Sequence, residues 1–91
     1  MEVSFSPSFL RTLKTLPLPL REMALEKIDL FQDPSRHAVL KVHKLRGRLR
    51  ECYAFSVNYQ FRIVFAYVGK PRRAYLLAIG DHTVYDQFTN S

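Results

Sequence analysis

Residues 52–81, CYAFSVNYQFRIVFAYVGKPRRAYLLAIGD, decide the fold because their apolar side chains alternate with a period of two. Alternation of this kind is typical of strands that bury one face. Short polar connections at residues 58–60 and 69–71 divide the stretch into three segments, the last of which covers 74–79. The pattern therefore predicts three strands joined in an antiparallel meander.

Upstream of this stretch the period becomes helical. Ser6 and Pro7 can begin a helix, because serine caps helix N-termini and proline needs no hydrogen bond at the first helical position. The LPLPL motif at 16–20 ends this helix and opens a second one, which stops at Asp33 and Pro34. Apolar stripes on the two helices predict a helical hairpin with one buried face. The stripes are Phe9, Leu10, Leu13 and Leu16, then Leu20, Ala24, Ile28 and Phe31.

These segments predict one α+β domain over residues 1–91. An antiparallel sheet of about four strands, with residues 3–5 at one edge, carries the helical hairpin on one face. The other face has no obvious cover in the sequence, so we expect it to be solvated, bound by a partner or functional. A chain of 91 residues supports one modest core.

Composition excludes several classes of protein. No apolar run approaches the ~20 residues of a membrane span, and the N-terminus MEVSFSPSF lacks the features of a secretory leader. The single cysteine, Cys52, excludes an internal disulfide and suits a reducing cytoplasm; we expect it to be a half-buried small apolar residue. With three scattered histidines, the chain offers no metal-ligand motif, and we expect no cofactor.

The charge points to a polyanionic partner. The formal net charge is +6, and residues 34–50 contain six cations without one acid. The preceding helical segment, in contrast, carries four acids. This asymmetry predicts a surface that binds phosphate groups. The six cations are Arg36, Lys41, Lys44, Arg46, Arg48 and Arg50.

Five polar residues at predicted strand ends are candidates for chemistry: His43, Arg62, Asp81, His82 and Tyr85. RNA cleavage without a metal needs a base, a cation on the phosphate and an acid, while the ribose 2′-OH supplies the nucleophile. Histidine suits both proton transfers, and arginine binds two phosphate oxygens at once. Each residue also has an ordinary structural explanation, such as a turn acceptor for Asp81. His37 looks like a loop residue without a role.

The order of these elements, with three motifs, resembles the RelE/ParE superfamily of bacterial type II toxins over nearly the whole chain. The motifs are LRG after His43, FRIVF around Arg62 and IGDHTVY at 79–85. The resemblance implies a RelE-like fold of the microbial-ribonuclease type and a cognate antitoxin whose C-terminal segment wraps the toxin. In the RelE branch it also implies metal-independent cleavage of mRNA in the ribosomal A site by 2′-OH attack.

The resemblance further implies roles for single residues. Arg62 matches the phosphate-stabilising arginine, and His43 and His82 match the two outer histidines of YafQ-like toxins, which act in proton transfer. Phe61 falls where those toxins carry an aromatic residue that contacts RNA. Tyr85 resembles the C-terminal tyrosine of RelE, at a shorter spacing.

The chain also departs from the family pattern. Ala54 and Ser56 stand where RelE has lysines, and Ser56 also replaces a histidine of YafQ-like toxins. Gln60 stands where YafQ-like toxins have an aspartate, and a glutamine cannot take up a proton at neutral pH. The role of base therefore falls to His43.

We therefore predict a ribosome-dependent mRNA endonuclease with His43 as base, Arg62 on the scissile phosphate and His82 as acid, assisted by Asp81 and Tyr85. Its expected partners are a cognate antitoxin, mRNA and the ribosome, with no membrane. One alternative is a ParE-like inhibitor of DNA gyrase with the same fold and no nuclease activity; another is a module that only binds its antitoxin. The residues expected to contact RNA are Lys44, Arg46, Arg48, Arg50, Gln60 and Phe61.

Overall fold

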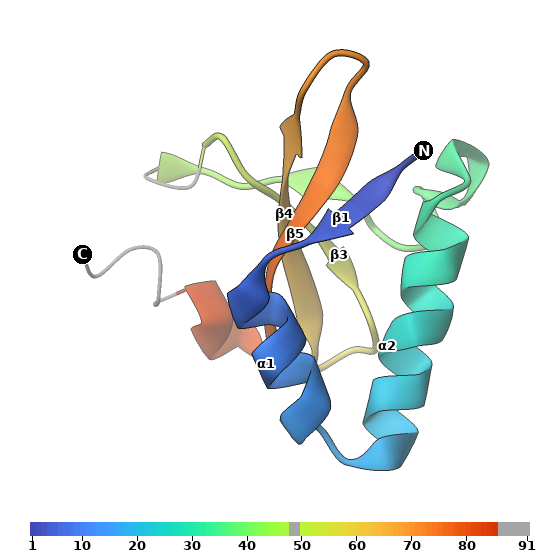
Figure 1. The fold of residues 1–91 in the computed structure, drawn as a ribbon, viewed down its shortest axis with the longest axis vertical. Helices are drawn as coiled ribbons and strands as arrows, with labels where there is room; N and C mark the ends of the chain where they lie inside the picture. Colours follow the sequence, from blue (N-terminus) through green and yellow to red (C-terminus); the bar gives the residue numbers. More distant parts are fainter. Residues whose placement is uncertain (48–49, 86–91) are drawn as a thin grey trace.

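The computed structural model of the protein describes residues 1–47 and 50–85 (Figure 1). The two α-helices lie on one side of the sheet, and the short 3₁₀ helix η3 lies on the other (Figure 1). Within the described residues, every helix is too short or too polar to cross a membrane. The elements are β1 (Val3–Phe5), α1 (Pro7–Thr15), α2 (Leu18–Phe31), the 3₁₀ helix η1 (Pro34–Arg36), β2 (His43–Lys44), β3 (Tyr53–Ser56), β4 (Arg62–Val68), β5 (Arg73–Gly80) and η3 (His82–Tyr85).

The strands form one sheet in the order β1-β5-β4-β3-β2. Strands β3, β4 and β5 are the predicted antiparallel meander, in which Arg62 lies opposite both Ser56 and Gly80. The predicted α+β architecture is confirmed, with two refinements. Strand β1 runs parallel to β5, and His43 and Lys44 form a fifth strand against β3. A strand of two residues shows no periodicity, which is why the sequence pattern did not indicate it.

Helix α1 begins where the sequence predicts. The Ser6 hydroxyl accepts a hydrogen bond from the Phe9 N–H at 3.0 Å and donates one to the Leu77 carbonyl at 3.1 Å. Pro7 occupies the first turn, where no N–H is needed. Because Leu77 belongs to β5, the capping residue of α1 also joins the helix to the sheet by a hydrogen bond.

Helix α2 begins at Leu18, one residue before the proline expected to open it, and buries the predicted stripe of Ala24, Ile28 and Phe31. The Asp33 carboxylate accepts hydrogen bonds from the Ser35 N–H and hydroxyl, which begins η1 and stops α2. These bonds lower the pKa of Asp33 below its ordinary value. The two helices run in opposite directions from their short connection (Figure 1).

The main core lies between the helices and the sheet, and aromatic rings fill its centre. Phe31 of α2 stacks on Phe55 with centroids 4.5 Å apart and meets Phe65 edge-on at 4.8 Å. His37 stacks on the outer face of Phe31 at 4.7 Å, and one ring nitrogen lies 2.8 Å from the Phe31 carbonyl oxygen. His37 therefore covers the core, a role that the sequence did not reveal.

A second, smaller core covers part of the helix-free face of the sheet. Val84 of η3 is 1% exposed and packs on Val64 and Ala78. The face expected to lack a cover is therefore partly covered, because a single valine supplies the contact and leaves no pattern in the sequence. Cys52 packs at the border of this cluster as the predicted half-buried residue, and burial, with a smaller effect of Glu51, raises the pKa of its thiol.

Candidate functional site

His43 occupies the exposed edge strand β2, where a backbone contact orients its ring. The Nδ1 atom lies 2.8 Å from the carbonyl oxygen of Lys41. A carbonyl oxygen can only accept a hydrogen bond, so Nδ1 carries the proton. In the neutral ring the Nε2 atom then holds the free electron pair. The arrangement presents an exposed imidazole whose Nε2 atom is the one able to accept a proton.

Arg62 opens strand β4 and is half-buried. Its Nη1 atom donates hydrogen bonds to the carbonyl oxygens of Asn58 and Phe61, at 3.1 Å for Phe61. These bonds orient the guanidinium group, and among the described residues they leave the Nε and Nη2 donors for another group. Within residues 1–47 and 50–85 no carboxylate forms an ion pair with Arg62. A fixed, uncompensated guanidinium edge is suited to two oxygens of one phosphate.

The sheet register brings His43 and Arg62 to the same face. His43 lies opposite Ala54, Ala54 lies opposite Val64, and Arg62 precedes Val64 by two residues. Residues opposite one another, or two apart on a strand, point to the same side of a sheet. Val64 belongs to the second core, so this side is the helix-free face. Strand spacing and rise place the two Cα atoms about 12 Å apart, which leaves room for a phosphate between the side chains.

The end of β5 brings η3 to the same region. Gly80 lies directly opposite Arg62, and the Asp81 carboxylate accepts hydrogen bonds from the Thr83 N–H at 2.9 Å and hydroxyl at 2.6 Å. Asp81 thus has the role of a turn acceptor that begins η3, and Val84 anchors η3 on the helix-free face. Its part in chemistry stays a prediction.

His82 and Tyr85 are placed only in part. Their backbone belongs to η3, which begins two residues after Gly80. Their side chains lie outside what the structure describes, so the predicted roles of both residues stay predictions.

The residues predicted to bind RNA are mostly exposed. Lys44, Arg46 and Arg50 are exposed around β2 and the connection to β3, and Arg48 lies outside the described residues. The Nε atom of Arg50 lies 4.0 Å from a carboxylate oxygen of Glu51, a surface contact that contributes little binding energy.

The other two predicted RNA contacts, Gln60 and Phe61, lie at the β3–β4 connection. Gln60 is exposed there, whereas Phe61 is half-buried against the main core. Asn58 holds this connection in shape, because its Oδ1 atom accepts hydrogen bonds from the Gln60 and Phe61 N–H groups at 2.9 and 2.7 Å. This role of Asn58 was not predicted from the sequence. Turn chemistry is the signal that identifies such an asparagine.

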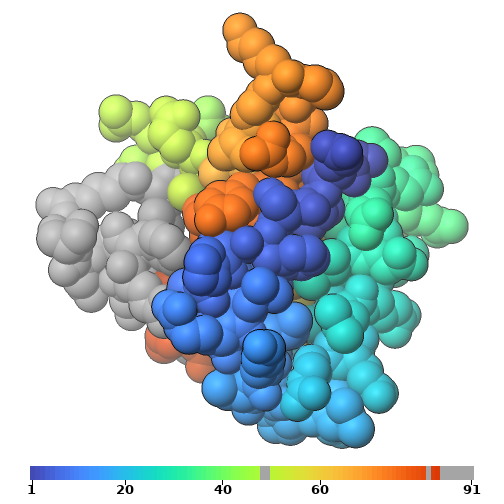
Figure 2. Space-filling view, viewed as in Figure 1, coloured from blue at the N-terminus to red at the C-terminus, as the bar shows by residue number. Residues whose placement is uncertain are grey.

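A further set of cations also escaped sequence reasoning. The connection between β4 and β5 projects from the body of the molecule (Figure 2) and carries Lys70 and Arg72, and Arg73 follows as the first residue of β5; all three are exposed. The Arg72 guanidinium lies 3.8 Å from the centroid of the Tyr67 ring, which holds its charge at the surface. Exposed cations therefore also occur outside the segment 34–50.

The site combines an imidazole of fixed tautomer with an anchored guanidinium on one face. Groups of these two kinds are able to serve two of the three functions that metal-independent RNA cleavage needs. No cluster of three potential metal ligands occurs within the described part of the chain.

Neither a protein-family model nor a curated protein matches the sequence. Solved structures of toxins do match. The toxin–antitoxin complex RelBE2 from Mycobacterium tuberculosis gives a TM-score of 0.70 at 20% identity, covering 89% of this chain and 96% of that one. A YoeB/ParE toxin from Agrobacterium tumefaciens gives a TM-score of 0.67 at 16% identity, covering 90% of this chain and 99% of that one.

A mutant of the toxin RelE from E. coli in the free state gives a TM-score of 0.67 at 20% identity, with coverages of 98% of this chain and 94% of that one. The chain therefore has the fold of the RelE, YoeB and ParE toxins, over about nine-tenths of its length.

Proposed function

We propose that this chain, which has the fold of the RelE, YoeB and ParE toxins, is the toxin of a type II toxin–antitoxin pair and cleaves mRNA on the ribosome. One observation carries the proposal. His43, with its Nε2 atom free, and Arg62, with one guanidinium edge free, lie on the same face of the sheet. An inhibitor that acts only by binding protein has no need of this pair.

The proposed reaction follows from the groups on this face. His43 Nε2 removes the proton from a ribose 2′-OH, and the 2′-oxygen forms a bond to the adjacent phosphorus. The bond from phosphorus to the 5′-oxygen breaks, which leaves a 2′,3′-cyclic phosphate, and an acid protonates the departing oxygen. Arg62 stabilises the charge that develops on the phosphate oxygens. We assign the role of acid to His82, which follows the strand residue opposite Arg62 by two positions.

The ribosome would supply substrate positioning. The site is open, and β2 lies at the edge of the sheet, so the protein alone holds RNA loosely. Positioning a nucleophile in line with its target can lower a barrier by several kcal/mol. The exposed cations near β2 would bind ribosomal and messenger RNA backbone, and this binding weakens with salt. The cognate antitoxin is the proposed protein partner, by analogy with the RelBE2 complex.

Mapping of mRNA 5′ ends after induced expression tests the proposal. We expect in-frame cuts at A-site codons for the wild type and their loss in Arg62→Ala and His82→Ala. Arg11→Ala, which removes an exposed arginine of α1, is the matched control and should cut normally. Growth arrest with DNA-damage signalling and without cuts would instead identify a gyrase inhibitor. Arrest and cuts relieved by the product of a neighbouring gene would identify the antitoxin.

A further inference from the structure

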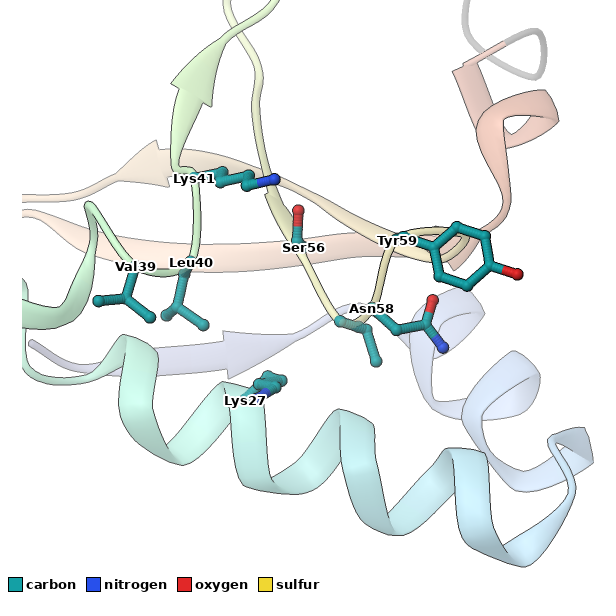
Figure 3. A pocket seen from close by; sticks show the side chains of 8 residues that line it. Lys27, Val39, Leu40, Lys41, Ser56, Asn58 and Tyr59 are labelled. Atoms are coloured by element: carbon teal, nitrogen blue, oxygen red, sulfur yellow. The ribbon is translucent and has the colours of Figure 1, made fainter.

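A pocket of about 230 Å³ lies beside the candidate site (Figure 3). It is bounded by α2, by residues 39–41 and by the β3–β4 connection. Its volume is below that of pockets that hold drug-sized ligands and suits one small group of about the size of a phosphate. The side chains that carry the following argument are Lys27, Lys41, Ser56, Asn58 and Tyr59.

Two lysines face this pocket from different elements. Lys27 rises from α2, and Lys41 extends from the opposite wall toward Ser56 (Figure 3). Neither forms an ion pair with any residue in the described ranges. Two uncompensated cations at one small pocket favour an anionic occupant.

An aromatic ring and a free amide complete the pocket. Tyr59 is 91% exposed, so packing does not explain its ring. The Oδ1 atom of Asn58 accepts two backbone N–H groups, and a nitrogen cannot do this; the side-chain Nδ2 donors are therefore the free end. An aromatic face and an amide donor are groups that bind nucleobases, the first by stacking and the second by hydrogen bonding.

The pocket is continuous with the candidate site. Ser56 lies opposite Arg62, and the carbonyl oxygen of Asn58 accepts a hydrogen bond from Arg62. The carbonyl oxygen of Lys41 is the atom that orients His43. Residues of the pocket thus contact both groups of the proposed site, and an RNA strand on that site would run past the pocket.

We propose that this pocket binds the nucleotide adjacent to the scissile phosphate of single-stranded RNA, with the base on Tyr59 and the phosphate between Lys27 and Lys41. The assignment of the scissile phosphate rests on the proposed function; the binding of RNA by the pocket does not. An acidic peptide is the less favoured occupant, because the pocket is short and ends in an exposed aromatic ring.

Binding of a single-stranded oligonucleotide with 2′-O-methyl riboses tests the pocket, because this RNA lacks the 2′-OH and cannot be cut by the proposed route. We expect Tyr59→Ala to weaken binding about 5- to 150-fold. Tyr59→Phe, which keeps the ring, should bind as the wild type does. In a plot of log affinity against log salt concentration, the slope should become less steep by about 0.7 in Lys27→Gln and in Lys41→Gln, because each variant loses one phosphate contact. Lys14→Gln, on α1, should keep the slope.

Three outcomes would overturn the proposal that this pocket binds RNA. The first is that the wild type binds no oligonucleotide at low salt, and the second is that Tyr59→Ala binds it normally. The third is that the lysine variants weaken the binding of antitoxin only. Cleavage on the ribosome is measured separately. Normal cleavage by the wild type together with unchanged RNA binding by Tyr59→Ala overturns the pocket and leaves the proposed function intact. Weakened binding in Tyr59→Ala, with no cleavage by the wild type, supports the pocket and overturns the nuclease.

Discussion

The carbonyl oxygen of Lys41 lies 2.8 Å from Nδ1 of His43 and thereby selects the tautomer whose Nε2 atom can accept a proton. Lys41 has a φ of 59°, in the left-handed region that lysine rarely occupies. The contact therefore depends on an unusual backbone conformation two residues before the proposed base.

The orientation of His43 predicts a specific kinetic defect. His43→Ala should lower the cleavage rate about 10²- to 10⁴-fold, the contribution of a general base, with a small effect on RNA binding. The measurement is single-turnover cleavage on programmed ribosomes. A fall in the rate with the RNA affinity kept distinguishes a base from a residue that only binds RNA. A rate close to that of the wild type would exclude His43 as the base.

The contacts of Arg62 predict that its substitution lowers both the stability of the protein and the rate of cleavage. Arg62→Lys keeps the charge but has a single nitrogen, which cannot hold the Asn58 and Phe61 carbonyl oxygens and also present a planar pair of donors to a phosphate. We expect the free energy of unfolding to fall by about 1–3 kcal/mol and cleavage to fall about 10²- to 10³-fold. Urea denaturation and single-turnover cleavage measure the two parts. Arg11→Lys should change neither quantity, and a fully active Arg62→Lys would argue against bidentate phosphate binding.

The burial of Val84 predicts that the packing of η3 on the sheet depends on this one apolar side chain. Val84→Ala removes two buried methyl groups and should lower the free energy of unfolding by about 1–3 kcal/mol. Val39→Ala makes the same change at a side chain that is 72% exposed, and it should be nearly neutral in urea denaturation. Equal losses in the two variants would show that η3 does not rest on Val84. If η3 positions His82, Val84→Ala should also slow cleavage while RNA binding is kept.

Local patterns in the sequence were sufficient for most of the fold. The Ser6 cap, the stripe from Ala24 to Phe31 and the alternation in 52–81 each specify an element through neighbours in the chain. Strand β2 and the cover from η3 were not visible. They depend on contacts between segments that are distant in the sequence and leave no periodic signal. One example is the hydrogen bond that the Ser56 N–H donates to the Leu40 carbonyl oxygen at 2.8 Å.

The candidate site was predictable as a list of residue types but not as an arrangement. Chemistry selected His43 and Arg62 among five candidates, and the resemblance to a toxin superfamily gave them their predicted roles. Their common face depends on the register of three strands, and the orientation of each side chain depends on a backbone carbonyl, from Lys41 or Asn58. A left-handed lysine cannot be anticipated from propensity, because the conformation is unfavourable for that residue.

Cys52 predicts a pH dependence whose sign follows from its surroundings. Burial first, and Glu51 second, raise the pKa of the thiol above its ordinary value of 9.0. The folded state then holds the thiol proton more tightly than the unfolded state does. This contribution to stability is fully present below pH 9.0 and is lost as the pH rises through the higher pKa of the folded state.

The rate of reaction with a disulfide reagent, measured as a function of pH, checks this expectation. The midpoint for native protein should lie at higher pH than the midpoint in urea, and the midpoint is informative because access affects only the absolute rate. Glu51→Gln should move the native midpoint part of the way down, since it removes the smaller cause. Glu2→Gln, which changes an exposed acid just before β1, should leave the native midpoint unchanged. Coincident midpoints in native and denatured protein would show that the second core does not shield the thiol.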